Sequence, residues 1–320
     1  MIILGISCFY HDSAACIVKD GQIIAAAAEE RFTRKKHDND FPKSAITYCL
    51  NELRIAMNEI DFVVFYEKPI IKFERLLSQH IEHFPKSYKA FIDVSESWIS
   101  KKLQIKRVLK EECHFHGKIL YLNHHLSHAA SSFFISPFKK AAIVTLDGVG
   151  EWETTTMGKA ENKSIKLDKR IIFPHSLGLL YSAITAFLGF KVNNDEYKVM
   201  GLASYGKPDK FRRKLSLLIN LFKDGSYQLN MKYFDYTWRE RMYANSLEKL
   251  FGFSARKAET KIEKHHADLA AALQEVLEKA IFNILNRTYK EYKLDNLCLS
   301  GGVALNSVCS QWENTKTHTL

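Results

Sequence analysis

The chain is organised around the stretch NHHLSHAAS (residues 123–131), the apolar run AAIVTL (141–146) and the turn DGVGE (147–151). The apolar run has the length and β-branched content of a buried strand, and Asp147-Gly148 ends it in a turn. Residues 126–135 predict a helix, so His124 and His128 at its start can share one face. Two imidazoles one turn apart, with a carboxylate at a strand end, are a plausible set of ligands for a divalent transition metal. From spacing alone, a polar helix cap beside a turn explains the pattern as well.

Composition limits the class of protein. A length of 320 residues with 46% hydrophobic residues favours a large two-lobed domain or two domains with a real core. The apolar start MIILGISCFY lacks a basic region, so it predicts a strand, and no run is long enough to cross a membrane. Six cysteines without CxxC spacing fit reduced thiols in a cytoplasmic protein. The net charge of +10 favours anionic ligands, but the lysines are scattered and no nucleic-acid-binding signature appears, so we expect neither a membrane nor a nucleic-acid partner.

The first third of the chain predicts a small sheet with helices. Strands are expected at residues 2–6, 14–18, 22–28, 62–66 and 118–122, with a hairpin turn of the Asp-Gly type at Asp20-Gly21. A helix is expected at 43–53. Residues 69–113 are charged, aromatic and periodic, which predicts a helical insertion.

A similar order of elements recurs after residue 140. A strand ends in a polar turn, and two extended segments follow at 152–158 and 165–173. This recurrence predicts an internally duplicated α/β domain, and such architectures bind ligands between their lobes. Further on, helices are expected at 176–188 and 263–290 and a strand at 296–299. Residues 196–206 are expected to form a short connection, and the basic, aromatic-rich stretch 211–254 is expected to be peripheral.

Three other segments have a possible binding role and an ordinary alternative. The loop SCFYHDS (residues 7–13) can present backbone N–H groups to a phosphate or can be a simple turn. The basic run RKKHD (34–38) can clamp a phosphate or carboxylate, or can be a solvated connection. The SGGVALN segment (300–306) joins a strand, two glycines and a helix start, which is the arrangement of a nucleotide-phosphate cradle.

Six segments together resemble the NodU/CmcH carbamoyltransferases. They span residues 5–42, HHLSHAASSFF, LDGVGE, PHSLGLLYSAITAFLGF, EYKVMGLASYG and LSGGVALN, and the resemblance covers Met1 to Val308. It implies an α/β fold made of a duplicated ribonuclease H-like (actin/hexokinase/Hsp70-type) two-lobed domain, with lobe I at about residues 1–135 and lobe II at about 136–320. It also implies transfer of a carbamoyl group from carbamoyl phosphate, through an ATP-derived carbamoyladenylate, to a hydroxyl of a small metabolite or sugar.

The resemblance implies a role for individual residues. The metal ligands fall on His124, His128 and Asp147, and the metal in the family is iron(II). His11 matches a residue lining the carbamoyl site, where an imidazole can take the proton of the attacking hydroxyl. Lys36 resembles a contact to the nucleotide phosphates, and nucleotide contacts also fall on Gly301, Gly302 and Asn306. ATP, with magnesium, and carbamoyl phosphate are the implied substrates.

The last residues depart from the family pattern. A PAAGDAG-like segment, whose aspartate is the fourth metal ligand, is absent from 310–320, and so is the YrdC-like domain that makes the adenylate. We therefore expect impaired turnover by this chain alone. The alternative function is a catalytically inactive nucleotide- and metal-binding fragment that needs a partner, either a separate YrdC-like chain or a second copy of this chain.

Overall fold

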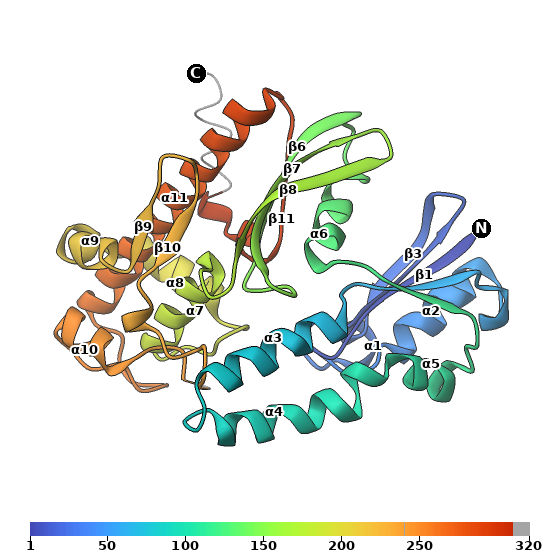
Figure 1. Cartoon of the computed structure of the whole chain (residues 1–320), viewed down its shortest axis with the longest axis horizontal. Helices are drawn as coiled ribbons and strands as arrows, with labels where there is room; N and C mark the ends of the chain where they lie inside the picture. Colours follow the sequence, from blue (N-terminus) through green and yellow to red (C-terminus); the bar gives the residue numbers. More distant parts are fainter. Residues whose placement is uncertain (240, 310–320) are drawn as a thin grey trace. The chain divides into compact units, whose positions relative to one another are not determined.

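A computed structural model describes residues 1–239 and 241–309. The chain divides into two compact units, Met1–Ser127 and a second one beginning at His128. The boundary falls inside one helix, α6 (His124–Phe133) (Figure 1). The predicted departure from the family at 310–320 lies outside the described residues.

The first unit is built on a five-stranded sheet in the order β3-β2-β1-β4-β5. Strands β1 and β2 and strands β2 and β3 pair antiparallel, whereas β1, β4 and β5 run parallel. Asp20 and Gly21 adopt positive φ angles of 51° and 86° in the predicted hairpin turn, which a tight two-residue connection requires. The strands are β1 (Ile2–Ser7), β2 (Ala14–Lys19), β3 (Gln22–Ala28), β4 (Phe62–Phe65) and β5 (Lys118–Tyr121).

Helices of the first unit cover this sheet and form the predicted insertion. The buried Glu29 carboxylate accepts hydrogen bonds from the first N–H groups of α2, Ser44 N at 3.0 Å and Ala45 N at 2.7 Å, and so fixes where that helix begins. The helices are α1 (Glu30–Thr33), α2 (Lys43–Leu53), α3 (Pro69–Glu82), α4 (Tyr88–Ser100) and α5 (Ile105–Cys113), with short 3₁₀ turns η1 (Met57–Glu59) and η2 (Lys102–Gln104).

The second unit repeats the strand order of the first. Its four-stranded sheet runs β11-β6-β7-β8, with antiparallel β6-β7 and β7-β8 pairs and a parallel β6-β11 pair. Read from β8, the order β8-β7-β6-β11 is that of β3-β2-β1-β4 in the first sheet. The predicted duplication is therefore confirmed, and the chain has the actin-like, ribonuclease H-type α/β fold. The strands are β6 (Lys140–Leu146), β7 (Glu153–Glu161), β8 (Ser164–Ile172) and β11 (Leu297–Ser300).

Two expectations for the second unit are wrong. Residues 196–206 are not a simple connection, because Glu196–Ala203 forms helix α8 with Val199 in the core. The stretch 211–254 is not peripheral either, since Phe211, Tyr227 and Phe251 belong to the main hydrophobic core. The remaining elements are α7 (Leu177–Phe187), α9 (Asp209–Ser216), β9 (Ile219–Leu221), β10 (Tyr227–Leu229), η3 (Met231–Tyr233), α10 (Asn245–Phe251), α11 (Lys264–Tyr292) and η4 (Gly302–Leu305).

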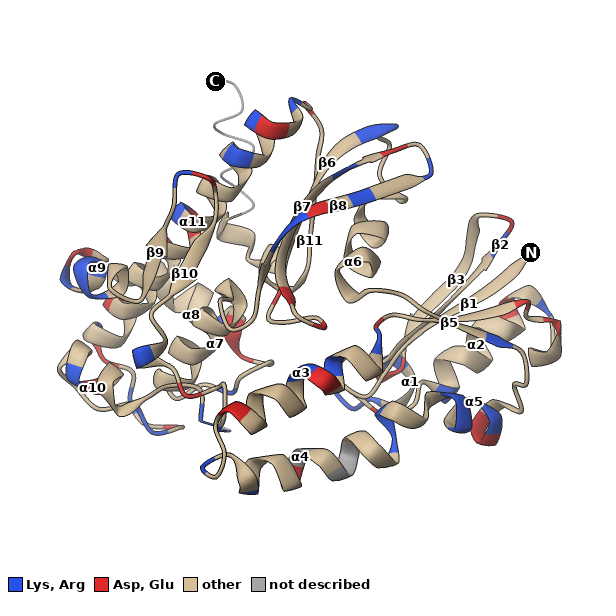
Figure 2. Cartoon of the chain, in the orientation of Figure 1, with Lys and Arg blue, Asp and Glu red and all other residues tan. Residues whose placement is uncertain are grey.

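The surface charge agrees with the dispersed pattern of the sequence. Lys and Arg occur on α5 in the first unit and on α9, β8 and α11 in the second, interspersed with Asp and Glu (Figure 2). Among the helices in the described ranges, none combines the length and the apolar character that crossing a membrane requires.

Candidate functional site

The two predicted histidines lie on the first turns of α6. Asn123 fixes the start of this helix, because its side-chain oxygen accepts a hydrogen bond from Leu126 N at 3.2 Å. The helix packs on the second sheet through Ala129 and Phe133, which share a small core with β6. One helical turn separates His124 from His128, so both imidazoles are placed by the helix itself.

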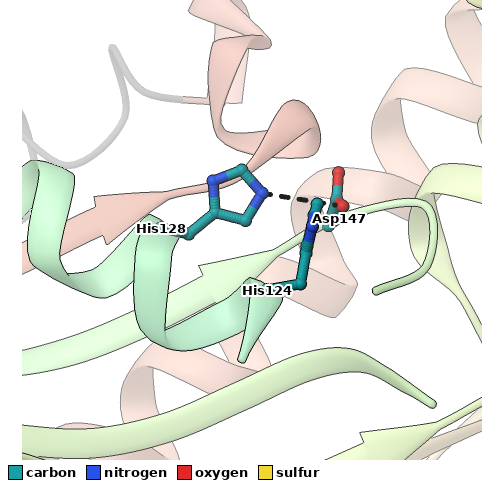
Figure 3. A group of neighbouring side chains, drawn as sticks. All are labelled: His124, His128 and Asp147. Carbon is teal, nitrogen blue, oxygen red and sulfur yellow. Dashed lines mark ion pairs between the residues drawn. The ribbon is translucent and has the colours of Figure 1, made fainter. Parts of the chain in front are cut away.

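Asp147 completes the group at the end of β6. The nitrogen and oxygen ligand atoms of His124, His128 and Asp147 all lie within 4.8 Å of one another (Figure 3). His128 Nε2 is 3.6 Å from Asp147 Oδ2, and two ligands that each lie about 2.1 Å from a tetrahedral metal are separated by about 3.4 Å. His124 is 7% exposed, whereas the side chains of His128 and Asp147 are 29% and 18% exposed. The donor set and its partial exposure therefore fit a divalent metal with room for an outside ligand.

His125, the neighbour in sequence, is not part of this group. Its side chain is completely buried, and it does not belong to the cluster of ligand atoms around Asp147. Helical periodicity explains the difference, because adjacent residues point about 100° apart around the helix.

The Asp147 carboxylate is held by the turn that follows β11. Gly302 N–H donates to Asp147 Oδ1 at 3.1 Å, and Ser300 Oγ donates to the backbone oxygen of His128 at 2.8 Å. On the other side, Ser176 Oγ donates to Gly148 O at 2.6 Å and accepts from Leu179 N at 3.0 Å, so the N-terminus of α7 adjoins the Asp147-Gly148 turn. The segments around Asp147 are thus tied together by hydrogen bonds between side chains and backbone groups.

The predicted nucleotide-binding residues have clear structural roles. Gly301 has a φ of 97°, and a Cβ there would lie 2.2 Å from Leu146 O, so only glycine fits. The expected helix after the glycines is only the four-residue turn η4. Asn306 and Gln274 exchange two amide hydrogen bonds of 3.0 Å, which attach η4 to α11.

His11 and Lys36 both lie in the first unit. His11 is in the loop between β1 and β2, where its Nδ1 is 2.8 Å from Asp12 Oδ2. Lys36 is an exposed residue in the segment after α1. Burial raises the pKa of Asp12, but hydrogen bonds from His37 and His11 outweigh this effect, so the pKa lies below its ordinary value.

Sequence reasoning missed a buried polar group beside His124. The Glu67 carboxylate follows β4 and lies 3.7 Å from His124 Nδ1, and it accepts a 2.5 Å hydrogen bond from Lys72 Nζ on α3. Glu67 and Lys72 are 2% and 4% exposed. A carboxylate behind a histidine is the arrangement that orients imidazole ligands in metal sites. In the sequence, the one indication of this role for Glu67 is that an acidic residue follows the strand expected at 62–66.

The helical insertion, for which the sequence indicated no chemistry, brings two lysines to the loop that carries His11. Lys72 Nζ lies 4.9 Å from the centre of the Tyr10 ring and Lys102 Nζ lies 5.8 Å from it, and Lys102 is also 4.5 Å from the Trp98 ring. Burial, together with the nearby charge of Lys72, lowers the pKa of Lys102 to about 8.

We expect Lys102 to be unusually reactive toward acylating reagents. At pH 8 about half of its amine is neutral, against well under 1% for a lysine with the ordinary pKa of about 10.4. Limiting acetic anhydride at pH 8, followed by peptide mass spectrometry, should label Lys102 before the exposed neighbour Lys101. The preference should shrink as the pH is raised toward the ordinary lysine pKa of about 10.4. Equal labelling at pH 8 would contradict the lowered pKa.

The chain is similar to proteins of known sequence over nearly its whole length. It is 48% identical over 316 residues to the uncharacterized protein sll1178 of Synechocystis sp., covering 96% of this chain and 51% of that protein. It is 33% identical over 308 residues to the nodulation protein NolNO of Sinorhizobium fredii, covering 93% of this chain and 41% of NolNO. The chain therefore spans about half the length of these relatives.

Among solved structures, component A of the Acidaminococcus fermentans (R)-2-hydroxyglutaryl-CoA dehydratase matches all of this chain and 90% of its own, with a TM-score of 0.48 and 12% identity. The HypF protein of T. kodakarensis matches 99% of this chain and 44% of its own, with a TM-score of 0.46 and 13% identity. The family model described as "Carbamoyltransferase N-terminus" matches residues 2–316. With that match and the relatives above, this chain belongs to the carbamoyltransferase N-terminus family.

Proposed function

We propose that this chain is the transfer domain of an O-carbamoyltransferase. The reaction moves a carbamoyl group from carbamoyl phosphate, through a carbamoyladenylate made with ATP and magnesium, to a hydroxyl of a small metabolite or sugar. One observation carries the proposal: in a chain of this family, the His124–His128–Asp147 group is joined to the Gly301-Gly302 turn through the 3.1 Å hydrogen bond from Gly302 N to Asp147 Oδ1. A cluster of metal-type ligands thus adjoins the segment that resembles a nucleotide contact.

His124, His128 and Asp147 are the residues that would hold the divalent metal, iron(II) in our proposal. Glu67 lies behind His124 Nδ1, which leaves Nε2 as the ligand atom of that ring. When bound, the metal supplies a Lewis acid for carbamoyl or phosphate oxygens.

The other residues act on the proton and on the phosphate charge. Asp12 holds His11 through Nδ1, so Nε2 is the atom available to accept the proton of the acceptor hydroxyl. Lys36 offsets phosphate charge as an exposed cation. Gly302 N–H donates to Asp147, so the role of this glycine is to orient the carboxylate. Gly301 allows the turn to pack against β6, and Asn306 attaches it to α11.

Carbamoyl transfer can be tested with labelled carbamoyl phosphate. The pure chain, ATP, magnesium, iron(II) and a panel of hydroxylated acceptors are mixed under nitrogen, with and without a separately expressed YrdC-like domain. We expect label in an acceptor in the complete mixture, and a loss of about 100-fold or more for His11→Asn because the proton acceptor is removed. His116→Ala, an exposed histidine outside the site, is the control.

The opposite outcome would identify the alternative function. If the chain binds metal and ADP but no label reaches any acceptor in either mixture, carbamoyl transfer by this chain is excluded. The function would then be that of a nucleotide- and metal-binding module that needs a partner.

A further inference from the structure

A second group of ligand-type side chains lies wholly within the first unit, and it is defined here as the Asp12 cluster: His11, Asp12, Glu30 and His37. Asp12 comes from the loop between β1 and β2, Glu30 begins α1, and His37 follows that helix. One ligand atom each of Asp12, Glu30 and His37 lies within 4.8 Å of the others. None of these three residues belongs to the His124–His128–Asp147 group.

The distances in the Asp12 cluster match the spacing of ligands around one cation. His37 Nδ1 lies 2.8 Å from Asp12 Oδ1. Two ligand atoms at about 2.1 Å from an octahedral ion are about 3.0 Å apart when adjacent, so a cation can replace the proton between this pair with little movement. Glu30 Oε2 accepts a 3.1 Å hydrogen bond from His37 N, which keeps its carboxylate beside the same residue.

The backbone presents these side chains in a fixed frame. Asp12 and His37 adopt positive φ angles of 51° and 55°, in the left-handed region that Asp and His enter more readily than most other residues with a side chain. Two backbone hydrogen bonds between the loops maintain this conformation, Ser13 N to Asp38 O at 2.7 Å and Phe9 N to Asn39 O at 2.8 Å. These bonds hold the segments that carry Asp12 and His37 beside each other.

Charge also favours a cation at this position. Asp12 and Glu30 contribute two negative charges, while the nearby Lys35 ammonium is directed to Asp38 and Asp40 at 3.6 and 3.1 Å. Arg31 Nη2 approaches Glu30 only at 3.8 Å, and its side chain is 74% exposed, so screening makes this pair weak. His11 Nδ1 at 2.8 Å from Asp12 Oδ2 supplies the outer hydrogen bond that ligating carboxylates usually have.

We propose that the Asp12 cluster is a second divalent-cation site, with Asp12 Oδ1, a Glu30 oxygen and His37 Nδ1 as protein ligands and water in the remaining positions. Two carboxylates with one imidazole suit Mn²⁺ and ions of similar preference. The side chains of Asp12, His37 and Glu30 are 49%, 32% and 25% exposed, so ion and water can enter. Because Asp12 also holds His11 in the proposed transfer reaction, the site is tested by ion binding and not by turnover.

Mn²⁺ titration of the full chain, followed by electron paramagnetic resonance of the free ion, tests this site. We expect two bound ions for the unaltered chain and one for His124→Ala. In the His124→Ala background, Asp12→Asn should weaken the remaining binding by about 100-fold, because it removes a charged ligand. Glu52→Gln, which removes an exposed carboxylate of α2 outside the cluster, should leave that binding unchanged.

The two metal proposals fail separately in this experiment. A folded His124→Ala chain that binds no Mn²⁺ at millimolar concentration would overturn the second site. A chain that loses all binding with Asp12→Asn alone, and none with His124→Ala, would instead overturn the first. Glu30→Gln is the second variant for the case that Asp12→Asn does not fold, and circular dichroism of each variant checks its fold.

Discussion

Replacing His128 by alanine should nearly abolish metal binding at the α6 site. The imidazole is one of three protein ligands in our proposal, and its Nε2 faces Asp147 Oδ2 at 3.6 Å. Loss of a residue that only supports a ligand already costs about 10–100-fold in metal affinity, so loss of a ligand should cost more than about 100-fold. Asp147→Asn should have a similar effect, because it removes the charge while its oxygen can still accept from Gly302 N–H.

Metal content is best measured by elemental analysis after anaerobic loading with iron(II) and dialysis. Iron bound at the second cation site proposed above would add to the measured iron content. Each variant is therefore made in the Asp12→Asn background, which removes a ligand of that second site. His116→Ala, which removes an exposed histidine, serves as the matched control. Undiminished iron in both His128→Ala and Asp147→Asn would show that these residues do not hold the metal.

Replacing Gly301 by alanine should cause the largest loss of stability of any glycine substitution near the site. The added Cβ would lie 2.2 Å from Leu146 O, at a residue whose φ is 97°. Neither the strand β6 backbone nor the turn can move away cheaply, so we expect the free energy of unfolding to fall by about 3 kcal/mol or more. Displacement of Gly302 would also break its hydrogen bond to Asp147.

Urea unfolding followed by circular dichroism measures this effect. Gly201→Ala is the matched control, because it lies inside α8 and a Cβ there meets nothing within 4 Å. In a helix interior that change should raise stability by about 0.5–1 kcal/mol. Equal stability of the Gly301→Ala chain and the unaltered chain would contradict the close approach of the turn to β6.

Much of the local structure could be predicted because it depends on neighbours in sequence. Helix α2 begins and ends where its periodicity places it, and the Asp-Gly turn joins β2 to β3 as its residue types require. The His124–His128 pair shares a helix face for the same reason. The recurrence of strands and turns along the sequence also indicated the duplication seen in the two sheets.

The stretch 211–254 was expected to be peripheral because it is basic, and its structure shows why that expectation was wrong. Lys214 lies 5.6 Å from the centre of the Phe211 ring, and its ammonium donates to Phe251 O at 2.9 Å. Long lysine stems cover apolar surface while their charges reach polar groups, so a basic sequence can still form core. Helix α8 was missed because Val199 is its one buried residue, and a single buried position leaves no periodic pattern to detect.

By itself, the sequence determined the two sheets, the duplicated order of strands and the histidine pair with a strand-end aspartate, because each depends on periodicity or turn chemistry over a few residues. Only the tertiary structure decided what surrounds them. Gly302 reaches Asp147 across 155 positions, Glu67 lies behind His124, and His37 meets Asp12 across 25 positions. These contacts form because elements distant in sequence pack together, and a local sequence pattern does not predict that packing.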